Sequence, residues 1–333
     1  MQPRTWLDQV TEEIIDPERP ICDPHHHLWD YPGSRYLLHE LMEDLDSGHR
    51  VVSTVFVECN AMFNADAPRH LAPVGETEFV QGVAAMSASG QYGECRVAAG
   101  IVSHADLMLG SGVREVLEAH VRAAPGRFKG IRHTTSWHES DDIRNSHSNP
   151  VAGQMLDDRF NEGLAVLGDM GLSFDAWCFH SQLDEFAALA AGHPGLTIIL
   201  DHFGGPLGIG PYQGQGDEVF AAWKDSINAL QGLDNVYFKL GGINMKINGF
   251  DWHRRDLPPT SDELVDRTAA YYEHCIDTFG ADRCMFESNF PVDRESVSYP
   301  VLWNAFKKIA SSRTPAEQER LFLGTARQVY RLP

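Results

Sequence analysis

The chain lacks the features that mark several common classes of protein. Its six cysteines form no Cys-X-X-Cys pair, and most of them lie in or beside apolar runs, so we expect reduced, buried thiols. No apolar run approaches the ~18 residues that a membrane helix needs. Residues 1–20 also lack the continuous apolar core of a secretory signal. These absences predict a soluble, cytoplasmic protein.

Basic residues are scarce in this chain. Lys and Arg together number 27 against 47 Asp and Glu, which gives a formal net charge of −20. Nucleic acids and anionic membranes bind basic surfaces, so we expect neither as a partner. No Gly-X-Gly-X-X-Gly follows the first apolar run and no Gly-X-X-X-X-Gly-Lys-Ser/Thr occurs, so nucleotide binding has no support. A small-molecule substrate is the expected partner, and homo-oligomerisation is left open.

What the chain does contain is a regular alternation of apolar runs and amphipathic segments. The apolar runs are rich in Val, Ile and Phe, which is typical of strands buried on both faces of a parallel sheet. Eight such strands alternating with helices predict an α/β fold of the (β/α)8 barrel type, with an open doubly wound sheet as the alternative. We expect strands at 21–28, 51–58, 96–103, 127–134, 172–180, 197–202, 235–241 and 283–289, and helices at 112–124, 157–170, 181–192, 217–230, 262–279 and 314–331.

The length of the chain fits one large domain. A barrel with loop insertions is the main fold that reaches 333 residues around a single core. We therefore expect an N-terminal extension over residues 1–20 and a barrel over residues 21–333. Segments 60–77 and 204–216 are predicted to be inserted loops.

Polar residues gather where the predicted strands end. The first strand ends in His25-His26-His27, and because a strand alternates its faces, His25 and His27 share one face while His26 takes the other. In such a barrel the carboxyl ends of the strands meet at one mouth, where the chemistry occurs. The strand ends therefore predict one site, which collects His25, His27, Glu58, His104, Arg132, His133, His180, His202, Lys239, Ser288 and Asn289.

Four strand motifs resemble those of a known family. They are His25-X-His27, Asp201-His202-Phe203-Gly204, Val236-Tyr237-Phe238-Lys239-Leu240-Gly241 and Glu287-Ser288-Asn289-Phe290-Pro291. Together they resemble the amidohydrolase-related branch of the amidohydrolase superfamily, and they are similar to lactonases that act on pyrone dicarboxylate and on sugar lactones. The resemblance implies a distorted (β/α)8 barrel and hydrolysis at a carbonyl. It also implies a site built from the first-strand pair, a histidine on the fifth or sixth strand, and the eighth-strand acid.

The eighth-strand motif departs from the family pattern at Asn289. Where the family usually has a carboxylate that takes the proton from the attacking water, this chain has an amide, which cannot act as a general base. His202, His180 and Glu58 are the candidates for that base, and Asn289 keeps the capacity to donate a hydrogen bond to a carbonyl oxygen. An inactive homologue is the alternative interpretation, and the retained histidines argue against it.

A divalent metal ion is an open alternative for this site. Zinc takes three or four N, O or S ligands, and a catalytic zinc leaves one position to water. His25, His27 and His180 can supply three nitrogens, with His202 or Glu58 as alternates. The resemblance includes both metal-dependent and metal-free members. Zinc, manganese and a metal-free site therefore all stay open.

The residues that end the fourth strand point to a substrate site. Arg132 and His133 are adjacent, so one side chain faces the barrel mouth and the other faces away. A guanidinium at the mouth can bind a carboxylate bidentately, although a salt bridge to a nearby acid is an equally good interpretation. Glu58 and the loop residue Trp137 complete the predicted substrate-binding set.

These observations lead to a mechanistic hypothesis. We expect a hydrolase that opens a lactone or a related carbonyl substrate by attack of an activated water at the mouth of the barrel. A metal-dependent decarboxylase of the same superfamily and a non-catalytic partner subunit of an active homologue are the alternatives. The predicted catalytic residues are His25, His27, His180, His202 and Asn289.

Overall fold

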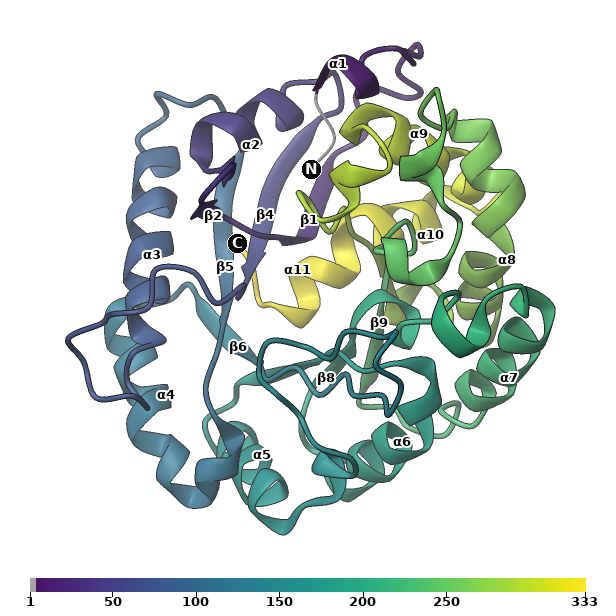
Figure 1. Ribbon diagram of the computed structural model, residues 1–333. Helices are drawn as coiled ribbons and strands as arrows, with labels where there is room; N and C mark the ends of the chain where they lie inside the picture. Colours follow the sequence, from purple (N-terminus) through teal and green to yellow (C-terminus); the bar gives the residue numbers. More distant parts are fainter. Residues whose placement is uncertain (1–3) are drawn as a thin grey trace.

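Eight parallel strands pair in chain order around a nearly closed barrel. The computed structural model describes residues 4–333, and its helices form a ring around the strands (Figure 1). The first and last strands meet through a parallel bridge between His26 and Phe290. The predicted (β/α)8 barrel is thereby confirmed. Its strands are β1 (Ile21–His26), β4 (Val51–Val57), β5 (Arg96–Ser103), β6 (Phe128–Arg132), β7 (Ser173–Ala176), β8 (Ile198–Leu200), β9 (Val236–Leu240) and β10 (Cys284–Phe286).

Helices connect these strands and cover their outer faces. The helices are α1 (Arg4–Leu7), α2 (Leu38–Leu45), α3 (Val74–Ala88), α4 (Val113–Ala123), α5 (Asp158–Asp169), α6 (Leu183–Gly192), α7 (Gly216–Asn228), α8 (Ser261–Phe279), α9 (Tyr299–Ile309), α10 (Pro315–Glu319) and α11 (Thr325–Val329). All six predicted helical segments coincide with helices. The sequence prediction missed α1, α2, α3, α9 and the hairpin of β2 (Trp29–Tyr31) and β3 (Ser34–Tyr36).

Helix α3 corrects one prediction in particular. The segment 60–77 was expected to be a loop throughout, but its last four residues, from Val74, begin α3. The buried face of α3 includes the polar residues Glu76, Thr77 and Ser87 beside Val80 and Val83. Because polar side chains share that face, the apolar periodicity that marks a helix in the sequence is weak here.

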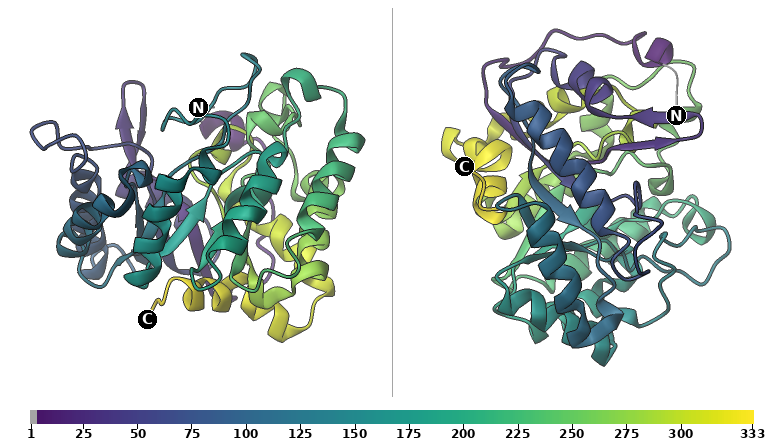
Figure 2. Two further views of the ribbon diagram at one scale, coloured as in Figure 1. Left: turned by 90° about the horizontal axis from the view of Figure 1, so that it is seen from below. Right: turned by 90° about the vertical axis from the view of Figure 1, so that its left-hand side faces the viewer.

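The C-terminal helix closes one end of the barrel. Figure 1 shows α11 across the centre of the ring, and Figure 2 shows the C-terminal helices gathered at one end of the strands. Side chains of α11 pack there against apolar residues that the strands turn inward, as a core distinct from the larger one. This barrel floor consists of Cys22, Val55, Val57, Val102, Ile199, Met285, Leu323, Ala326, Val329 and Tyr330, with Tyr237 packed against it.

The N-terminal segment is tied to the outside of the barrel. The predicted extension over residues 1–20 is described from Arg4 on, and its first three residues lie outside the described part of the chain. Glu12 accepts hydrogen bonds from the backbone N–H of Ser261 at 2.7 Å and from the Asn304 amide at 3.0 Å. Within residues 4–333, no helix is both long and apolar enough to cross a membrane.

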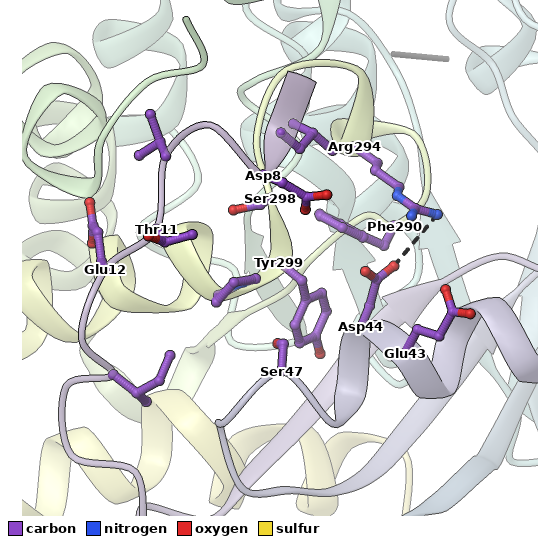
Figure 3. Close-up of a pocket in the computed structure, with 14 residues that line it drawn as sticks. Asp8, Thr11, Glu12, Glu43, Asp44, Ser47, Phe290, Arg294, Ser298 and Tyr299 are labelled. Carbon is purple, nitrogen blue, oxygen red and sulfur yellow. Dashed lines mark ion pairs between the residues drawn. The ribbon is translucent and has the colours of Figure 1, made fainter. Parts of the chain in front are cut away.

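A cavity of about 280 Å³ lies between this N-terminal segment, α2 and the chain after β10 (Figure 3). Arg294 forms an ion pair with Asp44 there, with 3.8 Å between the guanidinium and the carboxylate. The Tyr36 hydroxyl also donates to Asp44, at 2.9 Å. The cavity is thus bounded by groups that hold the N-terminal part of the chain against the barrel.

Candidate active site

The strands place a charged layer directly above the apolar barrel floor. Side chains two residues apart on a strand share a face. Glu287 therefore points into the barrel like Met285, one layer above it, and Lys239 does so one layer above Tyr237. The same alternation places the Asp201 side chain inside the barrel, two residues after Ile199. We call the resulting cluster the charged centre, which consists of His25, Glu58, Arg132, Asp175, Asp201, His202, Lys239 and Glu287, with every member buried.

Glu287 joins two histidines of the charged centre. One carboxylate oxygen lies 2.8 Å from Nδ1 of His25, and the other lies 2.6 Å from Nδ1 of His202. The two imidazole centroids are 4.5 Å apart. In the part of the chain that the structure describes, Nε2 of His202 has no hydrogen-bond partner. A carboxylate next to Nδ1 favours the tautomer of the imidazole whose proton is on Nδ1. Nε2 then has a lone pair and can accept a proton.

Two cations flank His25. A guanidinium nitrogen of Arg132 lies 3.2 Å from Nε2 of His25 and donates to it. The Lys239 ammonium lies 3.2 Å from Nδ1 and donates to Asp175 at 2.6 Å, while its distance to Asp201 is 3.1 Å. Burial, together with the positive charge of Lys239, holds the pKa of His25 well below its usual range. His25 is therefore neutral at neutral pH.

Negative charge exceeds positive charge in the charged centre. Although burial alone raises the pKa of Glu58, the Arg132 guanidinium, 2.8 Å away, holds it well below the usual range. Burial raises the pKa of Asp175 to about 6 in spite of Lys239. The Tyr330 hydroxyl, from the end of the chain, also donates to Asp175 at 2.6 Å. Two cations thus face four carboxylates: Glu58, Asp175, Asp201 and Glu287.

This surplus of negative charge fits a divalent cation. Donor atoms of His25, His202 and Glu287 lie within 4.8 Å of one another, and all three residues are buried. The oxygen of Glu287 that lies 2.8 Å from Nδ1 of His25 accepts no hydrogen bond. Two imidazoles and a carboxylate are suitable ligands for zinc or manganese. Among the described residues, the group of converging ligands contains neither His27 nor His180, which were predicted to join His25.

The predicted site residues divide into two groups in the structure. His25, His202, Arg132 and Glu58 meet in the charged centre. His27 adjoins them, with its ring centroid 4.9 Å from that of His25 and its Nδ1 bonded to a strand β4 carbonyl at 2.8 Å. The structure thus brings most of the predicted strand-end residues together, and the role of each remains a prediction.

Other predicted residues lie apart from the charged centre. Nδ1 of His180 accepts from the Leu207 backbone N–H at 3.3 Å, and its ring packs on Tyr212 at 4.9 Å. The backbone N–H of Trp137 donates to Gln182 at 3.0 Å, in the same loop region. Burial lowers the pKa of His180 to about 4. These two residues have local partners in loops around the mouth.

Asn289 lies at the end of the last strand, in a left-handed backbone conformation with φ of 54°. Its backbone N–H donates to the His25 carbonyl at 3.0 Å, and its side-chain amide donates to Asp293 at 3.0 Å. Burial raises the pKa of Asp293 to about 7. Asn289 therefore joins the first and last strands next to the charged centre, and its amide is paired with a buried carboxyl group.

Sequence reasoning missed several members of the charged centre. Lys239 was predicted as a strand-end residue of the site, but Glu287 was not, although it stands inside a quoted motif and counting two residues on from Met285 would have selected it. Asp201 could have been found in the same way. No such pattern marks Tyr330, because Asp175, to which its hydroxyl donates, is 155 residues away in the chain.

A larger cavity, of about 710 Å³, lies beside the charged centre. We call it the side cavity. Its wall includes His147, whose Nε2 is 3.0 Å from Glu58, and His133, the predicted substrate-binding residue next to Arg132. It is lined by residues that follow β4, β5 and β6: Asn60, Phe63, Arg69, His70, Ala72, Pro73, His104, Asp106, Met108, Leu109, His133, His147, Ser148, Asn149, Val151 and Gln154.

Comparisons with known proteins agree with this architecture. A family model described as amidohydrolase matches residues 22–332. The uncharacterized protein y4mH of Sinorhizobium fredii is 30% identical over 334 residues, covering 94% of this chain and 98% of that protein. The L-fucono-1,5-lactonase of Burkholderia multivorans is 27% identical over 320 residues, covering 93% of this chain and 96% of that enzyme. All three matches cover nearly the whole chain.

Solved structures show the same similarity. The crystal structure of an amidohydrolase from Burkholderia multivorans with bound HEPES has a TM-score of 0.69 and 26% sequence identity, covering 94% of this chain and 99% of that chain. A second crystal form of an amidohydrolase from that organism, with the same values, contains bound zinc. Zinc in a relative with this barrel agrees with a ligand group such as His25, His202 and Glu287.

Proposed function

Because this chain belongs to the amidohydrolase family, a family of hydrolases, we propose that it opens a lactone with water at the mouth of its barrel. The pair of His202 and Glu287, 2.6 Å apart and beside His25, is the observation that carries the proposal. Similarity to an L-fucono-1,5-lactonase over nearly the whole chain supports a cyclic ester as the substrate class.

In this proposal, His202 is the group that accepts the proton of the attacking water. Nδ1 of His202 donates a hydrogen bond to Glu287. The proton of the neutral imidazole is therefore on Nδ1, and the lone pair is on Nε2, on the side of the ring away from Glu287. The negative charge of Glu287 also stabilises the imidazolium that forms. Glu287 therefore supplies the carboxylate that is absent at Asn289, two residues further along the chain, and acts through the imidazole.

The two cations provide the complementary half of the site. Arg132 and Lys239 hold positive charge on both sides of His25, where a carbonyl oxygen that gains negative charge would be stabilised. If a divalent ion is bound by His25, His202 and Glu287, it would polarise a carbonyl or lower the pKa of a bound water, and His202 would then serve as its ligand instead of as the base.

A direct assay tests the proposal. The purified protein is incubated with a panel of lactones while released acid is titrated, and carbon dioxide is measured in the same vessel. We expect acid without carbon dioxide. His202→Gln should lower the rate at least a hundredfold, whereas His39→Gln, at an exposed histidine, should not change it.

Three results would contradict the proposal. Carbon dioxide in proportion to turnover would indicate a decarboxylase. A rate in His202→Gln equal to that of the parent chain would remove His202 from the role of base. No turnover of any lactone, with a second barrel protein found in complex with this chain, would indicate a non-catalytic partner subunit. Metal analysis of the same preparation shows whether an ion is bound, and its loss in His202→Gln would assign the ion to His25, His202 and Glu287.

A further inference from the structure

We infer that Asp293 is a positioning residue, which fixes the Asn289 amide so that the amide oxygen holds the attacking water for His202. The inference rests on the proposed function and adds to the site a residue that lies outside the strand motifs. It also gives the amide at position 289, which cannot act as a base, a defined part in the reaction.

A carboxyl group holds one end of the Asn289 amide. Nδ2 of Asn289 donates to Oδ1 of Asp293 at 3.0 Å, and the two residues are 1% and 0% exposed. A carboxylate only accepts hydrogen bonds, so the NH2 end of the amide must face Asp293 and the oxygen must face the other way. The orientation of the amide is therefore a consequence of its partner.

The backbone keeps the two side chains at this separation. The Asp293 N–H donates to the Asn289 carbonyl at 3.1 Å, which closes one turn of the chain. The Asp293 carbonyl accepts from the N–H groups of Ser296 and Val297, at 2.9 and 3.1 Å. The Asn289 N–H donates to the His25 carbonyl at 3.0 Å. The pair is therefore anchored to the first strand at a residue of the charged centre.

Two atoms beside His25 have a free lone pair and are open to a ligand. Within residues 4–333, Oδ1 of Asn289 accepts no hydrogen bond, and it is not fully enclosed, unlike Oδ2 of Asp293. Nε2 of His202 is unpaired in the same way, and its ring centroid is 4.5 Å from that of His25. Both atoms accept hydrogen bonds, so a donor between them would satisfy both.

The backbone conformation marks the same two residues. The φ angle is 54° at Asn289 and 53° at His202, in the left-handed region that residues other than glycine rarely adopt. Such conformations cost free energy and cluster where a function requires a particular direction of the side chain. Their presence at both residues that carry an open acceptor supports a shared role for the two side chains.

One water molecule suits this pair of acceptors, because it has two O–H groups. It would donate one to Nε2 of His202 and the other to Oδ1 of Asn289, which directs an oxygen lone pair at the lactone carbonyl. As the new C–O bond forms, His202 takes one proton and the carbonyl oxygen gains the electron pair. The ester C–O bond then breaks, and His202 returns the proton to the departing alkoxide. The second hydrogen stays on the water oxygen, so Asn289 positions the water and exchanges no proton with it.

A double-mutant cycle tests the inference. Lactone hydrolysis is followed at pH 8, above the pKa of about 7 to which burial raises Asp293. Asp293→Leu should lower kcat by about tenfold or more and change KM by less than about threefold. Asn289→Ala should lower kcat at least as far, and the double variant should be no slower than Asn289→Ala. Asp293→Asn keeps an acceptor oxygen and should retain at least about a third of the parent rate, and Asp169→Leu, on the exposed side of α5, should retain all of it.

Nuclear magnetic resonance tests the hydrogen bond without turnover. The side-chain NH2 signals of Asn289 in ¹⁵N-labelled protein are identified by their absence from Asn289→Ala. We expect them to move and to exchange faster with solvent in Asp293→Leu, and to stay near their parent positions in Asp293→Asn. Asp293→Ser, whose hydroxyl is too short to reach Nδ2, should behave like Asp293→Leu and replaces it where leucine prevents folding.

Several results would overturn the inference. They are an unchanged kcat in Asp293→Leu, losses that multiply in the double variant, a loss in Asp293→Asn as large as that in Asp293→Leu, and NH2 signals that do not respond to Asp293→Leu. Multiplied losses would mean that Asp293 acts independently of Asn289. Signals that respond, without turnover of any lactone, would remove the proposed function and leave the orientation of the Asn289 amide standing.

Discussion

Histidines line both the charged centre and the side cavity, yet their surroundings are opposite. His25 lies between Arg132, Lys239 and Glu287, at distances of 2.8 to 3.2 Å. His133 has an amide and a backbone N–H as partners, and among the described residues its only close charge is the half-exposed Asp106 carboxylate, 4.0 Å from its Nδ1. Both lie at the ends of strands and both are buried, so residue type and position alone do not separate them. The neighbours decide the chemistry, because fixed charges next to an imidazole control its protonation and its tautomer.

The largest expected effect comes from removing the carboxylate of the charged centre. Glu287→Gln keeps the size of the side chain but loses the negative charge that two histidines share. In lactone hydrolysis we expect kcat/KM to fall about a thousandfold, within the range of general acid–base catalysis. Glu118→Gln, on the exposed side of α4, is the matched control and should keep full activity. A fall of less than about threefold would remove Glu287 from the catalytic machinery.

Removing a cation of the charged centre should strongly lower stability. Lys239→Met leaves Asp175 and Asp201 buried without their shared ammonium, and breaking a buried ion pair in this way costs about 3–5 kcal/mol. Lys246→Met removes an ammonium that is 2.7 Å from Glu295 but half exposed, and it should cost no more than about 1 kcal/mol. Urea unfolding of both variants measures the difference. Equal losses would mean that the charged centre is effectively solvated.

A pH dependence is expected from the segment that joins the two regions. Glu76 accepts from the backbone N–H groups of Cys59 and Ala61, at 3.1 and 2.7 Å, between Glu58 of the charged centre and Asn60 of the side cavity. Burial, and then the charge of Glu58, raises the pKa of Glu76 from 4.5 to about 8. Between these two values the folded chain holds a proton that the unfolded chain has released. The free energy of unfolding should therefore fall as the pH rises from 4.5 to 8.

Substitution isolates this contribution. Each pH unit within the window changes the free energy of unfolding by at most about 1.4 kcal/mol through Glu76. Glu76→Gln is neutral at every pH, so its unfolding free energy should fall less between pH 5 and pH 8 than that of the parent chain. Glu78→Gln, two residues further and exposed, should retain the parent slope. The same slope in Glu76→Gln and in the parent chain would contradict the assignment.

The smallest effect is expected at the contact between the barrel floor and the charged centre. Tyr330→Phe removes the hydroxyl that donates to Asp175 at 2.6 Å and keeps the ring in the apolar floor. We expect a loss of about 1 kcal/mol in unfolding free energy, the usual value of one hydrogen bond. Tyr237→Phe, whose ring also packs against the floor, should have almost no effect. No difference between the two variants would show that Tyr330 acts only through its ring.

The eight strands were predictable because each one needs only local information. A run such as Val51–Val57 carries Val or Phe on both faces, which is typical of a strand buried on both sides. Helix α3 was not predictable in this way, because Glu76 and Thr77 occupy its buried face and form contacts with distant segments. Propensity and periodicity describe such a face poorly when its partners are polar.

The candidate site was predictable where the chain itself aligns the side chains. His25 and Arg132 lie at the ends of strands and His202 lies just after one, and parallel strands carry their ends to the same mouth, so the sequence alone determined that these residues gather there. Tertiary structure decided how they pair. Arg132 reaches His25 across 107 residues of chain, and Tyr330 reaches Asp175 across 155. Such pairs depend on barrel register and on where the C-terminal helix packs, which are collective properties of the folded chain, whereas the alternation of apolar and polar residues along a strand is local.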